Sequence, residues 1–141
     1  MRNGALIWTA LIAGFGVVYA ILARVRKKYR MRMITCVIRP EQLSDVTTAL
    51  RKTGLMTGMT VTDVRGFGRQ RGANEPAVHE TLRFLPKLKI ETLVRDLDLE
   101  QTMDVLSEAL RTGQIGDGKM IVFEAVSTMR VRTGEKGLSA L

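Results

Sequence analysis

The chain has 141 residues, enough for one domain with a single hydrophobic core and a short appendage. Its formal net charge is +8, but residues 1–32 hold seven of the 22 basic residues and none of the 14 acidic ones. The rest of the chain is close to neutral, so no nucleic-acid partner is expected. The one cysteine, Cys36, excludes an internal disulfide, and its apolar surroundings predict a core residue rather than a reactive one.

The first predicted element is a transmembrane helix. Ala5 to Ala23 form a run of 19 residues without a charge, and a helix of this length spans about 28 Å, close to the hydrocarbon thickness of a bilayer. Trp8 and Tyr19 lie toward opposite ends of the run, where amphipathic rings prefer the interface. The basic cluster that follows predicts a single-pass protein of the inner (cytoplasmic) membrane, with its C-terminal domain in the cytoplasm.

Two other interpretations of this segment stay open. Ala20 and Ala23 resemble a signal-peptide cleavage site, although the bases of a signal peptide precede its apolar run. A buried core helix is the second alternative, and the bases directly after residue 23 make it a poor one.

The remaining residues show alternating strand and helix patterns. Apolar alternation or short apolar runs predict strands at 33–39, 59–66, 88–94 and 119–126. Apolar residues at helical spacing, each followed by a glycine, predict helices at 41–52 and 99–110. This order is that of an α+β, ferredoxin-like βαββαβ sandwich with an antiparallel sheet and both helices on one face. The other face would lack a cover, so oligomerisation is expected.

Three segments combine glycines with basic residues, namely 66–72, 113–119 and 130–134. Glycines let main-chain N–H groups approach an anion closely, and basic side chains add charge. In an extended segment, Arg130 and Arg132 would point to the same side, and their paired guanidinium groups suit a polyphosphate. Each segment alone is equally typical of an ordinary turn or a solvated edge, but together they predict a nucleotide site.

The same segments resemble the P-II family of nitrogen-regulatory signal-transduction proteins. Residues 60–72 look like the signature before the family's T-loop, 84–91 like the strand after it, 111–119 like the B-loop, and 130–135 like the C-terminal segment. The resemblance runs in order from Met31 to Glu135.

This resemblance divides the chain into a transmembrane helix with a basic flank at 1–30 and a P-II-like nucleotide-sensing domain at 31–141. The T-loop would cover about 67–85 and the B-loop about 112–119. It implies a homotrimer with a nucleotide site in each cleft between subunits, which binds ATP or ADP, Mg²⁺ and 2-oxoglutarate as effectors.

The resemblance also assigns site residues. Those for the nucleotide are Thr60, Gly68, Arg69, Gln70, Gly116, Asp117, Gly118, Lys119, Arg130 and Arg132, the two arginines reaching across from the neighbouring subunit. Gln70 would ligate the magnesium ion and, with Gly72 and Lys87, bind 2-oxoglutarate. Because the metal would bridge both ligands, ATP and 2-oxoglutarate are expected to bind cooperatively.

The sequence departs from the family pattern in two places. The span from Gly72 to Phe84 is about two residues shorter than the usual T-loop and contains no Tyr or Ser, so modification of the usual loop tyrosine is excluded. One extra residue lies near Met56, before Gly58, on the side expected to receive the adenine.

The resulting prediction is a membrane-anchored P-II-type regulator and not an enzyme. It would sense ATP/ADP and 2-oxoglutarate and control a membrane transporter or channel through its T-loop, with nitrogen-metabolism enzymes as further candidate partners. The main alternative is a P-II-like adaptor that responds to a different small ligand or metal to regulate a transporter. A weak ATP hydrolase is a second alternative, although no general base is evident beside the phosphates.

Overall fold

The computed structural model describes residues 18–22, 25, 30–67, 84–114 and 116–141. Its strands are β1 (Met31–Ile38), β2 (Thr60–Gly66), β3 (Leu85–Arg95) and β4 (Lys119–Ala125). Its helices are α2 (Leu43–Thr53) and α3 (Leu99–Leu110), with short 3-10 turns η1 (Pro40–Gln42) and η2 (Gly137–Ala140).

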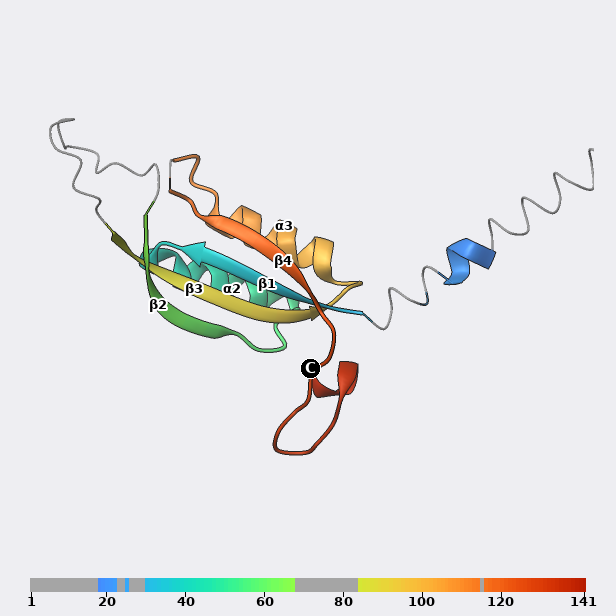
Figure 1. The fold of residues 1–141 in the computed structure, drawn as a ribbon. Coiled ribbons are helices and arrows are strands. Elements are labelled where there is room, and N and C mark those ends of the chain that lie inside the picture. The colour runs from blue at the N-terminus through green and yellow to red at the C-terminus, as the bar shows by residue number, and fades with distance from the viewer. Residues whose placement is uncertain (1–17, 23–24, 26–29, 68–83, 115) are drawn as a thin grey trace, which may run out of the picture.

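The four strands form one antiparallel sheet in the order β2-β3-β1-β4. Met31, at the start of β1, lies opposite Arg95 of β3 and Ala125 of β4, and Val37 lies opposite Lys89 and Lys119. Both helices cover the same face of the sheet (Figure 1). The ferredoxin-like α+β sandwich predicted from the residue pattern is therefore confirmed.

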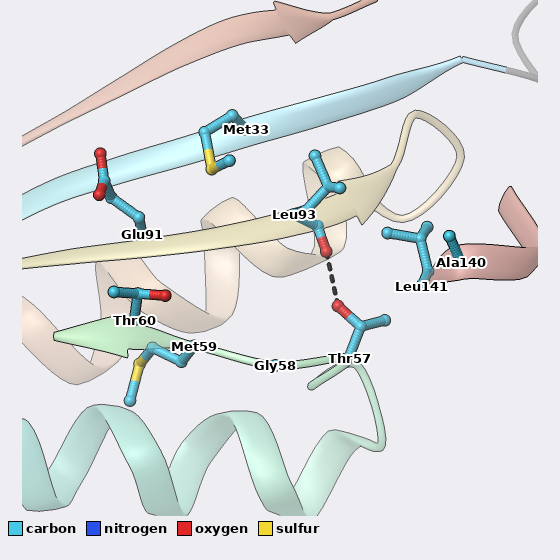
Figure 2. Close-up of a pocket in the computed structure, with 9 residues that line it drawn as sticks. All are labelled: Met33, Thr57, Gly58, Met59, Thr60, Glu91, Leu93, Ala140 and Leu141. Carbon is cyan, nitrogen blue, oxygen red and sulfur yellow. Dashed lines mark hydrogen bonds between the residues drawn. The ribbon is translucent and has the colours of Figure 1, made fainter. Parts of the chain in front are cut away.

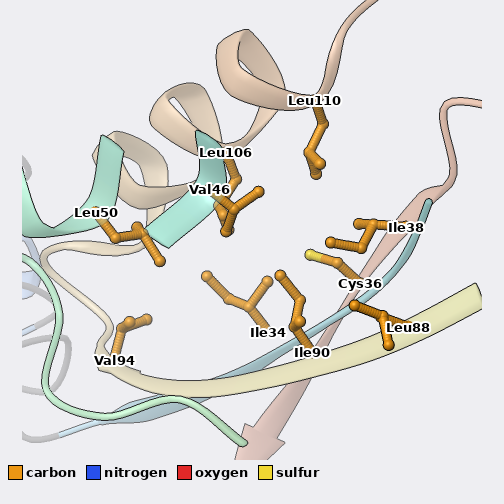
Figure 3. Close-up of a cluster of buried hydrophobic side chains, with 10 residues drawn as sticks. All are labelled: Ile34, Cys36, Ile38, Val46, Leu50, Leu88, Ile90, Val94, Leu106 and Leu110. Carbon is orange, nitrogen blue, oxygen red and sulfur yellow. The ribbon is translucent and has the colours of Figure 1, made fainter. Parts of the chain in front are cut away.

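The hydrophobic core lies between the helices and this face of the sheet (Figure 3). Period-two alternation turns every second residue of the central strands inward, and the helices contribute apolar residues three or four positions apart. Its buried residues are Ile34, Cys36, Ile38, Val46, Leu50, Leu88, Ile90, Val94, Leu106 and Leu110. Complete burial of one such aliphatic side chain contributes about 1.5–3 kcal/mol. Burial also raises the pKa of the Cys36 thiol to about 11, so the predicted core role of this cysteine is confirmed.

The opposite face of the sheet, called here the open face, carries apolar side chains that no helix covers. Ile121 and Phe123 of β4 are 44% and 53% exposed, and Met33 lies opposite Phe123 in the register. Burying these groups would require a second protein surface, as the sequence pattern led us to expect.

Two sequence-based expectations differ from the structure. β3 begins at Leu85 rather than at 88, because β2 continues to Gly66 and pairs with residues 85–87 of β3. Pro86 lies in this part of the strand, which has no partner on the β1 side. Residues 130–132 do not form an extended segment. The N–H groups of Thr133 and Gly134 bond to the Arg130 carbonyl at 3.2 and 2.8 Å, and positive φ at Gly134 (74°) allows the resulting turn.

Of the predicted transmembrane span, residues 18–22 are helical, and their side chains are exposed. The rest of that span lies outside the described residues. In the parts of the chain that the structure describes, no helix is long and apolar enough to cross a membrane.

Candidate functional site

One end of the sheet gathers the glycine-rich segments. β1 ends there at Ile38 and β2 at Gly66, while β3 begins there at Leu85 and β4 at Lys119. This end is called the loop end below. The turn between α3 and β4, residues 111–118, also lies there, so the fold brings together segments that are about 50 residues apart in the sequence.

Lys87 connects two of these segments. Its ammonium Nζ donates a hydrogen bond to the carbonyl oxygen of Gly116 at 3.3 Å. Its stem lies over Gly66, where an added Cβ would come within 3.0 Å of Lys87 Cγ. Burial lowers the pKa of Lys87, and the positive charge of Arg39 lowers it further, while two nearby carboxylates act in the opposite direction. Lys87 is therefore held at the junction between the start of the predicted T-loop and the predicted B-loop.

The carboxylate of Asp117 holds the 111–118 turn in shape. Its Oδ2 accepts hydrogen bonds from the N–H groups of Thr112 and Gly113 at 2.8 and 2.9 Å, and its Oδ1 accepts one from the Thr112 hydroxyl. Arg39 Nη2 lies 3.5 Å from Oδ1. These contacts, led by the Thr112 side chain, hold the pKa of Asp117 below its ordinary value. The Asp117 carboxylate therefore bonds mainly to groups of its own turn.

Two further contacts seat this turn on the sheet. Gly118 has φ +102°, and an added Cβ would lie 2.0 Å from the main-chain oxygen of Val37, so only glycine fits against β1 here. The buried Gln42 side chain donates to the Leu110 carbonyl at 2.9 Å and accepts from the Arg39 N–H at 2.9 Å. The turn therefore has a fixed position relative to Lys87.

A hollow of about 310 Å³ lies farther along the open face (Figure 2). It is lined by Met33, Thr57, Gly58, Met59, Thr60, Glu91, Leu93, Ala140 and Leu141. The Thr57 hydroxyl donates to the Leu93 carbonyl at 2.6 Å, which fixes the segment containing the extra residue against β3. Thr60 is the one residue of this lining that the resemblance assigned to the nucleotide.

The hollow and the loop end are joined along β2 and β3. Thr60 lies opposite Glu91, Thr62 opposite Lys89, and Val64 opposite Lys87. Glu91 lies four residue steps along β3 from Lys87, which is about 13 Å. The open face therefore offers an elongated surface with a partly apolar hollow at one end and, at the other, a glycine-rich turn next to Lys87 and Lys119.

The two predicted arginines lie elsewhere in the single chain. Arg130 Nη1 is 2.5 Å from Glu135 Oε2, and its Nη2 donates to the Leu141 carbonyl at 2.8 Å, beside the hollow. Arg132 is exposed in the following turn. The whole of β4 separates both arginines from residues 116–119, so within one chain they do not join the B-loop.

Four predicted site residues, Gly68, Arg69, Gln70 and Gly72, lie outside the described residues. Within the described ranges, no group of three or more His, Cys, Asp or Glu side chains could hold a metal. Sequence reasoning missed most of the hollow's lining, including Met33, Glu91 and Leu93. The one sequence feature that pointed to the hollow was the extra residue near Met56.

This fold places the chain among the small α+β domains with a ferredoxin-like sandwich, a class that hosts many functions. The family model described as "Nitrogen regulatory protein P-II" matches residues 31–135. The chain therefore belongs to the P-II nitrogen regulatory protein family, whose members are regulatory signal transducers and not enzymes.

Curated relatives and solved structures agree with this assignment. Nitrogen regulatory protein GlnK of Escherichia coli (strain K12) is 43% identical over 113 residues, covering 79% of this chain and 100% of that protein. Nitrogen regulatory protein P-II 1 of Methanothermobacter thermautotrophicus is 44% identical, covering 79% and 97%. Arabidopsis thaliana PII bound to citrate is similar at a TM-score of 0.67 and 36% identity, covering 79% and 92%. A B. subtilis GlnK–ATP complex is similar at 0.66 and 33%, covering 79% and 98%.

Proposed function

We propose that this chain is a membrane-anchored P-II-type regulator that senses ATP or ADP together with 2-oxoglutarate and controls partner proteins accordingly. The observation that carries the proposal is the position of Lys87. At the loop end it links β3 to the 111–118 turn, on a surface continuous with the hollow.

The elongated open face suits a nucleotide. The hollow would take the base and ribose between Thr60, Glu91 and Leu93, and the phosphates would extend toward Gly116–Lys119, where glycine-rich backbone and a lysine favour anions. The similar B. subtilis protein was solved as a complex with ATP, which supports a nucleotide on this fold.

A small dicarboxylate would bind at the loop end. Lys87 would pair with a carboxylate of 2-oxoglutarate, and Gln70 and Gly72 would complete its site. Mg²⁺, held by Gln70, phosphate oxygens and the keto acid, would supply the link between the two ligands. The similar Arabidopsis protein carries citrate, another small polycarboxylate, which supports carboxylate recognition in proteins of this kind.

A homotrimer would complete each site. The exposed Ile121 and Phe123 give the open face an apolar surface that a second copy can bury. Arg130 and Arg132, which β4 keeps away from the 111–118 turn of their own chain, would then reach the phosphates bound by a neighbour.

The apolar run at 5–23 and the basic residues after it support an anchor in the inner membrane. Confinement to the membrane raises the effective concentration of any partner held at the same surface, so weak contacts suffice. A membrane transporter or channel and nitrogen-metabolism enzymes are the partner classes that the sequence predicts.

Equilibrium dialysis of the full-length protein in detergent against Mg-ATP and Mg-ADP tests the proposal. We expect saturable binding of one nucleotide per subunit and a trimer by light scattering. Absence of nucleotide binding in a correctly folded trimer would contradict the sensor function. Nucleotide affinity that is the same with and without 2-oxoglutarate would favour the alternative function, an adaptor that responds to a different ligand.

A further inference from the structure

The two ends of the sheet connect to different parts of the chain. At the end opposite the loop end, called the anchored end, the N-terminal segment joins the domain. Met31 begins β1 there, paired with Arg95 at the end of β3 and Ala125 at the end of β4. The predicted membrane anchor and the predicted T-loop therefore leave the domain from opposite ends of the sheet.

The junction at the anchored end is fixed to the domain. The Asp96 N–H donates to the Arg30 carbonyl at 2.9 Å, and Arg32 Nε lies 2.5 Å from the buried Asp96 carboxylate. Glu124 of β4 lies 3.6 Å from Arg30 and 3.9 Å from Arg32. These contacts hold residue 30 against the ends of β3 and β4, so the attachment of the chain to the domain begins no later than residue 30.

Chain lengths then limit how the domain can sit on a membrane. Seven peptide steps from Ala23 to Arg30 span at most about 25 Å. The ten steps of β3 from Leu85 to Arg95 span about 33 Å. The linker is thus too short to run back along the sheet and present the loop end to the bilayer.

The connection between Phe67 and Phe84 cannot bridge this gap either. Both residues lie at the loop end, with their rings 5.9 Å apart. A segment of 17 peptide steps with both ends fixed there reaches no farther than about 30 Å from them, less than the length of β3.

We infer that the loop end faces the cytoplasm, away from the bilayer. Of the two partner classes proposed above, the one that docks at this end is therefore the water-soluble protein and not the membrane transporter. This inference rests on the proposed anchor and trimer. In a threefold trimer, three short linkers attached to the anchored ends keep those ends at equal height, which prevents the domain from lying on its side.

The surface at the loop end has the chemistry of a docking site for such a protein. Phe67 and Phe84 are 60% and 55% exposed, and aromatic residues and arginine are enriched at protein interfaces relative to the rest of the surface. Arg65 and Arg111 are exposed at the same end. The partner that fits is a soluble protein with an apolar pocket flanked by acidic groups, which the anchor would recruit to the membrane surface.

Energy transfer from the domain to the lipid tests the orientation. Full-length protein is placed in nanodiscs that contain an acceptor-labelled lipid, with a donor on Ser44→Cys at the loop end or on Ser127→Cys at the anchored end. Both serines are exposed and outside the proposed ligand sites. The buried Cys36, with its raised pKa, contributes little background labelling.

We expect strong transfer from position 127 and weak transfer from position 44. A biotin at position 44 should also bind soluble streptavidin readily on the nanodisc, whereas a biotin at 127 should be hindered. Equal transfer from the two positions, or stronger transfer from 44, overturns the inference.

A linker variant shows whether chain length sets the orientation. Insertion of about 20 flexible residues after Ala23 raises the root-mean-square reach of the linker to about 30 Å and should reduce the difference between the two positions. A difference that persists undiminished contradicts the length argument. Mg-ATP binding is measured on the same samples. Unequal transfer without nucleotide binding refutes the sensor function alone, and nucleotide binding with equal transfer refutes the orientation alone.

Discussion

The ammonium group of Lys87 donates a hydrogen bond to the carbonyl oxygen of Gly116, 3.3 Å away. Lys87 lies near the start of β3 and Gly116 in the turn before β4, and the antiparallel arrangement of the strands brings both to the same end of the sheet. A ligand that pairs with Lys87 would therefore also alter the turn proposed to hold phosphates. This contact gives a physical route by which a dicarboxylate and a nucleotide could influence each other's binding.

Lys87→Ala removes this contact and the proposed carboxylate partner. Loss of one hydrogen bond to a charged group costs about 1.5–3 kcal/mol, so 2-oxoglutarate affinity in the presence of Mg-ATP should fall by a factor of about 10 to 100. Lys89→Ala is the matched control, because Lys89 lies two residues along the same strand and pairs with Glu91. Calorimetric titration of both variants measures the effect. Equal losses in the two variants would show that Lys87 has no special role.

Gly118→Ala should disrupt the 111–118 turn. The new Cβ would meet the Val37 carbonyl oxygen at 2.0 Å, and φ of +102° is unfavourable for alanine. Strain and displacement together should lower the free energy of unfolding by about 3–5 kcal/mol. Gly113→Ala is the control, because φ there is also positive (76°) but no atom lies within 4 Å of the new Cβ. Its expected cost is about 1–2 kcal/mol.

Urea unfolding at one fixed protein concentration distinguishes the two glycine variants, since association with other subunits also contributes to stability. If both variants lose the same stability, the close approach of Gly118 to β1 is not what determines the turn.

Asp117→Asn should lower stability in a pH-dependent way. The hydrogen bonds from Thr112 and Gly113 and the charge of Arg39 favour the ionised carboxylate, so its pKa in the folded protein lies below the ordinary value of 3.8. The carboxylate therefore stabilises the fold above pH 3.8, and this contribution is lost as the pH falls through the lowered pKa. The difference between wild type and variant should be full at pH 7 and shrink below pH 3.8.

Thermal unfolding from pH 7 to pH 2 measures this dependence. Thr112→Val, which removes the hydroxyl that donates to Asp117, should show part of the same effect. A difference between wild type and Asp117→Asn that stays constant over the whole range would mean that the carboxylate charge contributes nothing to the turn.

Asp96→Asn should weaken the anchored end. Asp96 is 5% exposed, and its hydrogen bond to Arg32 is the main reason that the pKa of this arginine is raised. Loss of this charged contact should cost about 1.5–3 kcal/mol of unfolding free energy. Glu124→Gln alters the exposed side of the same cluster and should cost less than about 1 kcal/mol. A larger loss for Glu124→Gln than for Asp96→Asn in chemical denaturation would contradict this ranking.

The sheet, the helices and the core could be predicted from the sequence because each depends on a local period. Alternation along β1 and helical spacing along α3 predict which side chains face the core. Ile34 and Leu106 are examples of such buried residues. The turn after Arg130 was predicted wrongly, because the alternation of Arg130 and Arg132 resembles a strand. The left-handed backbone of Gly134 and the hydrogen bonds to the Arg130 carbonyl, which turn the chain, leave no periodic signal.

The candidate site was only partly predictable for a related reason. Glycine and lysine at 116–119 show their chemistry in the sequence, whereas Met33 and Leu93 line the hollow only because the register places them there. The hydrogen bond between Lys87 and Gly116 likewise follows from topology and not from spacing. Residue types therefore predict a ligand chemistry, which stays a prediction, and the fold was needed to show which residues meet.

The most direct test of the central claim is a calorimetric titration of 2-oxoglutarate into the full-length trimer in detergent, with and without saturating Mg-ATP. The account predicts binding that is at least about fivefold tighter with Mg-ATP, as expected for coupling of 1 kcal/mol or more, and loss of this difference in Gln70→Ala. Equal affinity with and without nucleotide, or no 2-oxoglutarate binding by a trimer that does bind ATP, would contradict the claim that this protein reads both ligands at one site.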